Sequence, residues 1–403
     1  MNPDQPLTLL GGLTPRKFLR KVWQKKPLLV RGALRDFAEP LTIKEIFTLA
    51  SREEAESRLV EGKGKHWLLT HGPIRAKRLA EARRTHSPWT VLVQDVQHHS
   101  HEAHALLANF GFISNARIDD LMVSYAVEGG GVGPHVDSYD VFLLQGSGKR
   151  RWQISTQEDL TLIEGMPLKI LKRFKAEQEF ILEKGDMLYL PPNVAHHGVA
   201  IGECLTWSIG FRAPTFQELG EFFLDARRDA LCLEGQYQDP TLEPAIHPGA
   251  IDAHMQATLL EVMRRVAESA MDEKNILRAL GCFLTAPKPH VLFDPPEDDW
   301  QPEDFAAAVQ RRGVRLTLAT RLLRCGDEYF CNGEHLPCLP GDADALLELA
   351  DRRTLDPVRR TSRAKSPCKF SPPYSRTLCR LLFNLHEAGA LDFATPNSEV
   401  PHG

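Results

Sequence analysis

The chain has 403 residues, so two or three domains are expected, each with its own core. Hydrophobic residues make up 42% and charged residues 25% of it, which is ordinary for a soluble globular protein and excludes a disordered chain. A net charge of −4 argues against a general nucleic-acid binder, because affinity for phosphate comes mainly from massed Lys and Arg.

No signal peptide or membrane span is expected. The N-terminal stretch MNPDQPLTLLGGLTPRKFLRKVW carries acids and prolines where a signal peptide has an apolar core, and no later stretch reaches the roughly 18 apolar residues of a membrane span. The eight cysteines form no C-x-x-C pair, which favours reduced thiols over a disulfide framework or a zinc cluster. We therefore expect a cytoplasmic protein.

The first part of the chain is mixed, and a strand-rich part follows it. Residues 15–24 and 43–50 have apolar residues at helical spacing, and PLLVRG between them predicts an extended stretch. From 118 to 211 short β-prone runs such as LMVSYAV, YDVFLLQG and CLTWSIGFR are separated by Gly, Pro and Asp turns. This spacing predicts a sandwich or barrel such as a jelly roll.

The period becomes helical after Pro214. Three helical runs predict a small bundle over residues 215–285, and the Pro-rich, acidic stretch 286–304 is the best candidate for a linker. Beyond it, predicted helices and strands surround a hairpin at Asn332-Gly333, the strongest two-residue turn signal in the chain. Helices with a short hairpin fit a winged-helix type of module.

Two residues of GGGVGPHVDSYDVF predict a metal site. Residues i and i+2 of a strand point to the same side, so His135 and Asp137 present an imidazole and a carboxylate to one space. Two histidines with one carboxylate select Fe(II) and leave positions open for a cosubstrate and O₂. The third ligand would be His196 or His197, and alternation does not separate them, since either can face inward after the Pro-Pro turn. A chance H-x-D pair without a metal remains the alternative.

The cations that follow add a second signal. Alternation with the apolar Trp152 puts Arg150 inside the barrel and leaves Lys149 and Arg151 in solvent. A buried guanidinium needs an anion. Either an internal salt bridge to Asp140 or Asp186 supplies it, or the far carboxylate of a dicarboxylic cosubstrate does, with its other end on the metal.

The glycines before His135 do not form a phosphate loop. GGGVG lacks both the G-K-[ST] ending and the following helix that phosphate binding requires. We expect Gly129 to Gly131 to take positive φ values and let the loop pass close to the mouth of the metal site.

The string G-P-H-x-D-x-Y-D-V-F-x-x-Q-x-x-G-x-x-x-W, with a later G-D-x-L-Y-x-P-P-x-x-x-H, resembles the JmjC-type 2-oxoglutarate oxygenases. Among these it is similar to the bacterial ribosomal oxygenases, which hydroxylate an arginine of large-subunit ribosomal protein sixteen. WQKKPLLVRG, ESRLV, RIDDLMVSYAV and GFRAPTFQEL extend the resemblance, and the helical and winged-helix segments follow in the same order.

The resemblance implies a mixed α+β fold. Its core would be a double-stranded β-helix of the jelly-roll, cupin-like kind, with a helical dimerisation region and a C-terminal winged-helix-like domain. The expected parts are an N-terminal covering segment (1–90), the catalytic JmjC domain (91–213), the dimerisation region (214–290) and the winged-helix-like domain (291–403).

The resemblance also implies roles for single residues. Fe(II) would lie on His135, Asp137 and His196, because the P-P-x-x-x-H spacing selects His196. Arg150 would hold the 5-carboxylate of 2-oxoglutarate, and Ser124 matches a position whose hydroxyl contacts this cosubstrate. Further candidates for contact with 2-oxoglutarate are Thr206 and Ser208, which share one face of a predicted strand.

The implied reaction consumes O₂ and places a hydroxyl on C3 of an arginine in a large-subunit ribosomal protein. The protein is expected to bind neither a membrane nor nucleic acid directly. A homodimer through residues 215–285 is implied as well, and the apolar helix faces there are larger than such a segment easily buries alone. These faces include Phe222, Phe223, Leu224, Leu259, Leu260, Val262 and Met263. The acids expected at the mouth, which either receive a guanidinium or are solvated turn residues, are Asp119, Asp120, Glu128 and Asp140.

Three other functions stay open. The first is a metal-binding barrel joined to a winged helix that binds nucleic acid without catalysis, for which the basic run 351–369 is the best support. The second is a JmjC hydroxylase of another residue, such as histidine. The third is a cupin-like isomerase or dioxygenase that uses no 2-oxoglutarate, although the H-x-H plus glutamate set common in that fold is not displayed.

Overall fold

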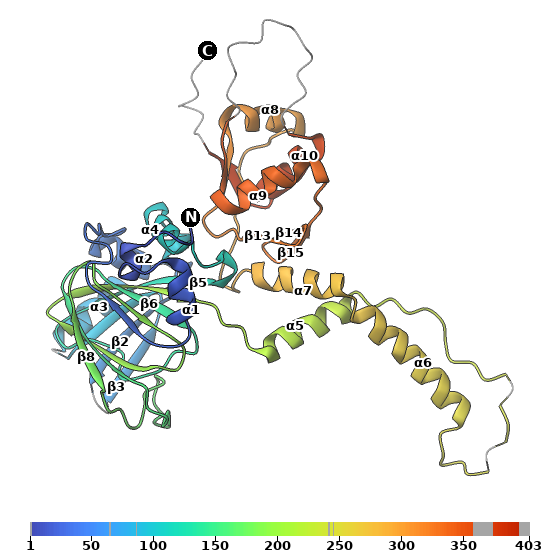
Figure 1. Ribbon diagram of the computed structural model, residues 1–403, viewed down its shortest axis with the longest axis horizontal. Coiled ribbons are helices and arrows are strands. Elements are labelled where there is room, and N and C mark those ends of the chain that lie inside the picture. The colour runs from blue at the N-terminus through green and yellow to red at the C-terminus, as the bar shows by residue number, and fades with distance from the viewer. Residues whose placement is uncertain are drawn as a thin grey trace, which may run out of the picture. The chain divides into compact units, whose positions relative to one another are not determined.

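The computed structural model describes residues 2–63, 66–85, 87–240, 242–244, 246–357 and 374–394. The chain forms two compact units, an N-terminal unit of Met1–Ala213 with Pro289–Leu292, and a C-terminal unit of Pro214–Lys288 with Phe293–Gly403 (Figure 1). Among the described residues, no helix combines the length and the apolar composition that crossing a bilayer requires.

The N-terminal unit is built on two antiparallel sheets. As far as the structure describes the chain, the larger has eight strands in the order β1-β9-β6-β11-β5-β4-β2-β3, and the smaller has three in the order β10-β7-β8. The strands are β1 (Leu28–Val30), β2 (Ser57–Lys63), β3 (His66–His71), β4 (Trp89–Val93), β5 (Ile118–Ala126), β6 (Asp140–Gln145), β7 (Lys149–Ser155), β8 (Gln178–Leu182), β9 (Met187–Leu190), β10 (Ala195–Ile201) and β11 (Cys204–Phe211). The helices are α1 (Pro15–Lys21), α2 (Ile43–Ala50), α3 (Ala76–Arg84) and α4 (His101–Leu106). This arrangement confirms the predicted jelly-roll core.

The central strands of the large sheet are buried on both faces, as β6 and β11 show along their whole length. One face packs against the N-terminal helices through an aromatic cluster, in which Phe18 lies 5.2 Å from Tyr189 and 5.8 Å from Phe142, centroid to centroid. The other face encloses, together with β7, β8 and β10, an interior that Val141, Leu143, Trp152, Ile154 and Leu188 line. Because that interior is apolar, the few polar side chains in it stand out as candidates for function.

The first 90 residues do more than cover the barrel. The predicted helices are present, and α2 begins with a capping box of Thr42 and Glu45, which fixes its start at Ile43. Three strands that we did not predict, β2, β3 and β4, extend the large sheet, with Ser57 opposite Val93. Charged residues interrupt the apolar pattern in β2, among them Glu61, so sequence alone gave no strand signal there.

The C-terminal unit ends in a winged-helix module, as predicted. Its elements are α8 (Pro302–Arg312), β12 (Val314–Leu316), β13 (Leu322–Cys325), β14 (Glu328–Cys331), β15 (Glu334–Leu336), α9 (Ala343–Arg352), β16 (Thr354–Leu355), α10 (Arg376–Glu387) and β17 (Leu391–Phe393). Asn332 and Gly333, with φ of 50° and 91°, make the turn between β14 and β15, which confirms the hairpin. In the basic run 351–369, residues 358–369 lie outside the described part of the chain.

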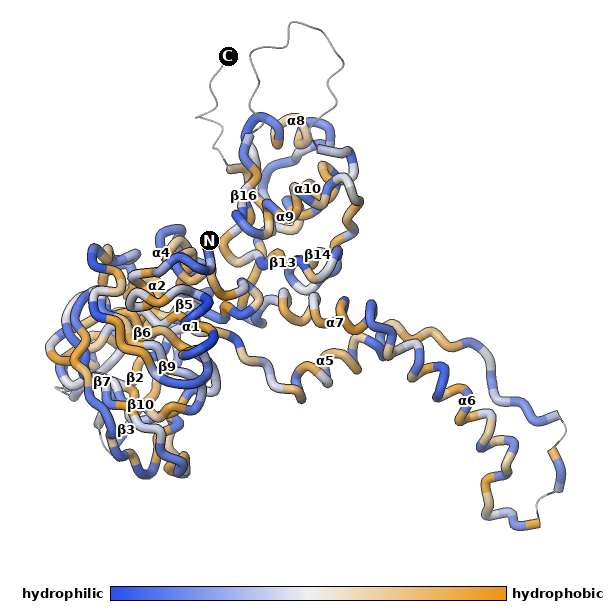
Figure 2. The backbone as a smooth tube through the Cα atoms, in the orientation of Figure 1, coloured by the Kyte–Doolittle hydropathy of each residue, from blue (hydrophilic) through white to orange (hydrophobic). Residues whose placement is uncertain are grey.

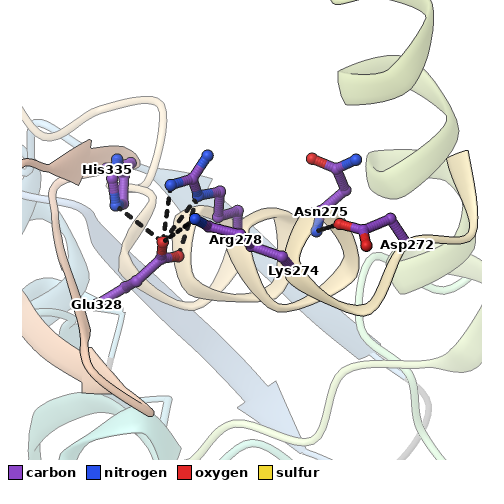
Figure 3. Close-up of polar contacts among 6 residues, drawn as sticks. All are labelled: Asp272, Lys274, Asn275, Arg278, Glu328 and His335. Atoms are coloured by element: carbon purple, nitrogen blue, oxygen red, sulfur yellow. Dashed lines mark hydrogen bonds and ion pairs between the residues drawn. The ribbon is translucent and has the colours of Figure 1, made fainter. Parts of the chain in front are cut away.

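Helix α7 (Glu273–Thr285) packs on the sheet of the winged-helix module. Its Arg278 donates to Glu328 of β14 from both Nε and Nη2, at 3.0 and 2.7 Å. Figure 3 shows Lys274 and His335 facing the same carboxylate, at 3.8 and 3.7 Å. The pKa of Glu328 lies below its ordinary value, and the hydrogen bond from Arg278 is the largest cause. The carboxylate therefore ties α7 to β14 and β15.

Helices α5 (Phe216–Asp229) and α6 (Ala253–Ala270) do not close into the bundle that the sequence predicts. Phe222 of α5 meets the ring of Phe283 in α7 at 5.2 Å, but no residue of α5 is buried. Along α6, hydrophobic and hydrophilic residues alternate (Figure 2), and the side of the helix that carries Leu260 and Met263 is exposed. One chain therefore leaves much of this apolar surface uncovered.

Candidate active site

The structure brings His135, Asp137 and His196 together at one end of the barrel interior. One possible ligand atom of each lies within 4.8 Å of the others. The Nε2 atoms of His196 and His135 are 3.5 and 4.0 Å from the carboxylate oxygens of Asp137. His197, the neighbouring candidate, instead packs edge-on against the ring of Phe174, with centroids 6.2 Å apart.

Both histidines are held in one orientation by the backbone. Nδ1 of His135 lies 2.9 Å from the carbonyl oxygen of Gly133, and Nδ1 of His196 lies 2.9 Å from that of Val194. Because a carbonyl oxygen only accepts, each Nδ1 carries the proton, and each Nε2 keeps its lone pair toward Asp137. Burial, and next the charge of His135, lower the pKa of His196 from 6.5 to about 4, so it is neutral at pH 7.

Arg150 projects from β7 into the interior, as alternation predicts, whereas Lys149 and Arg151 on either side are exposed. Arg150 is 5% exposed, and its guanidinium lies over the ring of Trp152, with 5.7 Å from Cζ to the ring centroid. Nη1 is 3.5 Å from Oγ of Ser124, the outer limit of a hydrogen bond. Nε and Nη2 are buried and hydrogen-bond to no residue that the structure describes.

Neither of the two carboxylates considered as an internal partner reaches Arg150. Asp186 binds Nη1 of Arg31 at 2.6 Å. Asp140 accepts from the hydroxyl of Tyr189 at 2.6 Å and from Nε2 of Gln24 at 2.9 Å. The placement of Asp140 at the mouth is therefore wrong, because this carboxylate is fully buried on the opposite side of the sheet, among the aromatic rings.

A short polar row crosses the interior beside Arg150. Thr206 of β11 stands opposite both Ser124 of β5 and Gln145 of β6, and its hydroxyl is 3.3 Å from Oε1 of Gln145. Ser208 lies on the same face of β11 and is buried. We did not single out Gln145 from the sequence, although it is the glutamine of the F-x-x-Q part of the motif. Hydroxyl and amide groups therefore line this side of the interior, beside the apolar side chains of the rest.

The glycine loop passes close to β10. Only Gly129 of the three has a positive φ, 73°, while a Cβ on Gly130 would come within 2.5 Å of the carbonyl oxygen of Trp89. A Cβ on Gly131 would meet the carbonyl oxygen of Gly198. Close approach of the backbone, more than positive φ, is thus the reason for glycine here.

Two of the predicted acids lie on the strand that leads to the metal ligands. Asp120 is buried on the same face of β5 as Ser124, and Gly210 stands opposite it, where a Cβ would come within 2.7 Å of Oδ1 of Asp120. Burial raises the pKa of the Tyr139 hydroxyl, and the charges of Asp137, Asp120 and Asp119 raise it further. Glu128 instead accepts a hydrogen bond from the backbone N–H of Gly202 at the surface.

These residues fit a redox metal and a dicarboxylic cosubstrate. The two imidazoles and one carboxylate are a donor set that suits Fe(II), and three protein ligands leave coordination positions open. Nε and Nη2 of Arg150, which have no hydrogen-bond partner within the described part of the chain, suit a carboxylate held by two parallel hydrogen bonds.

Known proteins show the same organisation. Residues 105–219 match the family model of the JmjC domain, and residues 268–372 match that of the ROXA-like winged helix. The ribosomal protein uL16 3-hydroxylase of Escherichia coli (strain K12) is 35% identical over 344 residues, 83% of this chain and 90% of that protein. A probable ribosomal oxygenase of Haemophilus influenzae is 38% identical over 369 residues, 85% and 87% of the two chains.

Solved structures of a ribosomal oxygenase are similar to this chain along almost its whole length. The X-ray structure of E. coli YcfD superimposes with a TM-score of 0.77 and 31% identity, covering 94% of this chain and 98% of that one. YcfD described as a ribosomal oxygenase, in complex with cobalt and 2-oxoglutarate, gives a TM-score of 0.75 at 31% identity, covering 95% and 99%. With its JmjC barrel, His-Asp-His cluster and winged helix, this chain belongs to the JmjC-domain ribosomal oxygenases.

Proposed function

We propose that this chain is an Fe(II)- and 2-oxoglutarate-dependent oxygenase that hydroxylates an arginine side chain, at C3, in a large-subunit ribosomal protein. The observation that carries the proposal is the buried Arg150, whose Nε and Nη2 have no partner among the described residues, in the same interior as His135, Asp137 and His196. The relatives named for uL16 hydroxylation and for a 2-oxoglutarate complex support the same assignment.

In this proposal the protein residues bind and orient. His135, Asp137 and His196 hold the metal, and Arg150 holds the far carboxylate of 2-oxoglutarate by two hydrogen bonds, with Ser124 beside it. When bound, Fe(II) with O₂ and 2-oxoglutarate supplies the oxidising power that an unactivated carbon requires, and 2-oxoglutarate leaves as succinate and CO₂. The polar row of Thr206 and Gln145 lies beside this carboxylate, and the apolar lining of the interior excludes water.

We assign recognition of the substrate side chain to the carboxylate of Asp120, close to the metal ligands. A substrate guanidinium is a planar cation with five donors, and a carboxylate is its natural acceptor. Asp120 lies on the face of β5 that carries Ser124, and its charge and that of the metal ligand Asp137 both act on Tyr139, so Asp120 is the carboxylate that we assign to a substrate guanidinium. This arrangement favours arginine over histidine as the hydroxylated residue, because imidazole offers a carboxylate fewer donors.

The proposed enzyme is a homodimer through α5 and α6. Leu224, Leu259, Leu260 and Met263 are between 46% and 66% exposed in one chain. A helix in a protein gains most of its stability by packing its apolar face against other residues. A second copy of the chain would cover this exposed face symmetrically. The proposed location is the cytoplasm, where ribosomal proteins are made, and no nucleic-acid contact is assigned to the winged helix.

Release of succinate tests the proposal. The protein, supplied with Fe(II), ascorbate, 2-oxoglutarate and purified uL16 of its own organism, should form succinate in proportion to hydroxylated uL16. A metal-binding module without catalysis would give succinate at the background level of a reaction without protein. Turnover that needs no 2-oxoglutarate would instead indicate a cupin-like enzyme.

A further inference from the structure

Trp152 of β7 is buried in the barrel interior, yet its indole N–H hydrogen-bonds to no residue that the structure describes. Buried donors in proteins are nearly always paired, because an unpaired one has lost the hydrogen bond that it made to water. The proposed function as stated gives this N–H no role. A partner that binds in the interior is therefore the natural acceptor for it.

The strand register places Trp152 between the metal ligands and Arg150. Trp152 lies two residues after Arg150 on β7, so both side chains point to the same face. On the neighbouring β10, Gly198 stands opposite Trp152, and the metal ligand His196 lies two residues before Gly198. The indole ring is 5.7 Å from Cζ of Arg150 and 5.9 Å from the centroid of the His196 ring. A molecule that joins the metal to Arg150 therefore passes beside Trp152.

Gly198 determines which end of the indole lies against β10. A Cβ on Gly198 would come within 2.7 Å of Cζ3 and Cη2 of Trp152, so the six-membered ring lies directly on the backbone there. Nε1 belongs to the five-membered ring, on the far side of the indole from these atoms. The N–H is thus directed away from this part of β10, which agrees with its lack of a backbone acceptor.

The far carboxylate of 2-oxoglutarate has acceptor positions that Arg150 does not fill. An ionised carboxylate has about four lone-pair sites, and Nε and Nη2 of Arg150 take two of them. The neighbouring hydroxyls already have acceptors. Ser124 donates to the carbonyl oxygen of Thr206 at 3.5 Å, and Oγ1 of Thr206 donates to Oε1 of Gln145 at 3.3 Å. The indole N–H of Trp152 is a donor beside Arg150 that has no acceptor among the described residues.

We infer that Trp152 is a further cosubstrate-binding residue, whose indole N–H donates to the far carboxylate of 2-oxoglutarate beside Arg150. This inference rests on the proposed function, because it needs a dicarboxylic cosubstrate in the interior. Its consequence concerns specificity. Trp152 would help the site to prefer a 2-oxo acid with a second carboxylate over one without it.

Binding of two 2-oxo acids tests this inference. The full-length protein is loaded with Zn²⁺ in place of Fe(II), so that no turnover occurs, and is titrated by calorimetry with 2-oxoglutarate and, by competition, with 2-oxobutyrate, which lacks the second carboxylate. W152F removes the N–H but keeps an aromatic ring. It should raise the dissociation constant of 2-oxoglutarate about 10-fold, the lower end of the range for hydrogen bonds to charged groups, and leave that of 2-oxobutyrate unchanged.

The matched control is W207F. Trp207 is as buried as Trp152, but its Nε1 donates to Glu39 at 2.6 Å, so the variant should bind both acids as the wild type does. This control makes the same change in size at a buried indole whose N–H already has a partner. A loss of affinity that comes only from looser packing would therefore appear in both variants.

A spectroscopic readout separates the assigned role from a purely structural one. In protein labelled with ¹⁵N-tryptophan, each of the six tryptophans gives one indole N–H signal, and W152F identifies that of Trp152. This signal should move downfield when 2-oxoglutarate binds and not when 2-oxobutyrate binds. An unchanged affinity for 2-oxoglutarate in W152F, or equal weakening for both acids, would overturn the inference and leave the proposed function intact. A wild type that does not bind 2-oxoglutarate would refute the proposed function itself, and the inference with it.

Discussion

The backbones of His135 and His196 exchange two hydrogen bonds, with N–H to O=C distances of 3.0 and 2.9 Å. This bridge holds the loop that follows the glycines against the start of β10. The centroids of the two imidazole rings are 4.1 Å apart. Because the backbone holds the pair, removing one side chain should leave the site's framework intact.

His135→Ala or Asp137→Ala should therefore abolish succinate formation while the melting temperature without metal changes little. Neither side chain belongs to a hydrophobic core cluster of the described residues, so truncation removes little core packing. His197→Ala is the control, since His197 contacts Phe174 rather than the cluster, and it should keep most of the activity. Near-normal 2-oxoglutarate turnover in the Asp137→Ala variant would show that the cluster is not the metal site.

Arg150→Lys should weaken 2-oxoglutarate binding by roughly 1 to 3 kcal/mol, the range for hydrogen bonds to charged groups. Lysine keeps the positive charge but loses the paired Nε and Nη2 donors. This corresponds to a dissociation constant raised about 5- to 150-fold, measured by displacement of labelled cosubstrate. Arg151→Lys, at an exposed position of the same strand, should bind as the wild type does. The reverse ranking would place the wrong arginine in the interior.

Asp120→Asn should raise the KM for the ribosomal substrate by roughly one to two orders of magnitude, because it removes the acceptor charge of a charge-assisted hydrogen bond. The slow turnover of 2-oxoglutarate without substrate should not change, since Asp120 is assigned to neither metal nor cosubstrate. Asp119→Asn, on the opposite face of β5, is the control and should have a much smaller effect. An unchanged KM in Asp120→Asn would remove this residue from substrate recognition.

Leu260→Glu should split the homodimer by placing a charge in its apolar interface. Multi-angle light scattering at micromolar concentration should give twice the chain mass of 45.3 kDa for the wild type and the single mass for the variant. Leu68→Glu makes the same change at a leucine of matching exposure, 55% against 57%, on β3, and should remain dimeric. A wild type with the mass of one chain would contradict the assignment.

Much of the barrel was predictable from sequence because its signals are local. The Pro-Pro turn, the spacing of His135 and Asp137, and alternation around Trp152 each depend on a few neighbouring residues. Asn332-Gly333 fixed a hairpin for the same reason, since both residues tolerate a positive φ.

What sequence could not supply depends on contacts far along the chain. Asp140 looks like an exposed acid beside the motif, but its partners Tyr189 and Gln24 are distant in sequence and bury it. Gln145 gained meaning only when β6 paired with β11 and set it beside Thr206. The strand β2 needed β4 as a neighbour to be stable, because its own apolar pattern is interrupted at Glu61.

The most direct test of the central claim is the mass of the intact ribosomal proteins from cells that lack this chain. Our account predicts that one large-subunit protein loses the mass of a single oxygen atom, that fragmentation places the missing hydroxyl on an arginine, and that the wild-type gene restores it while the Asp137→Ala variant does not. Identical masses in both strains for every large-subunit protein would contradict the account.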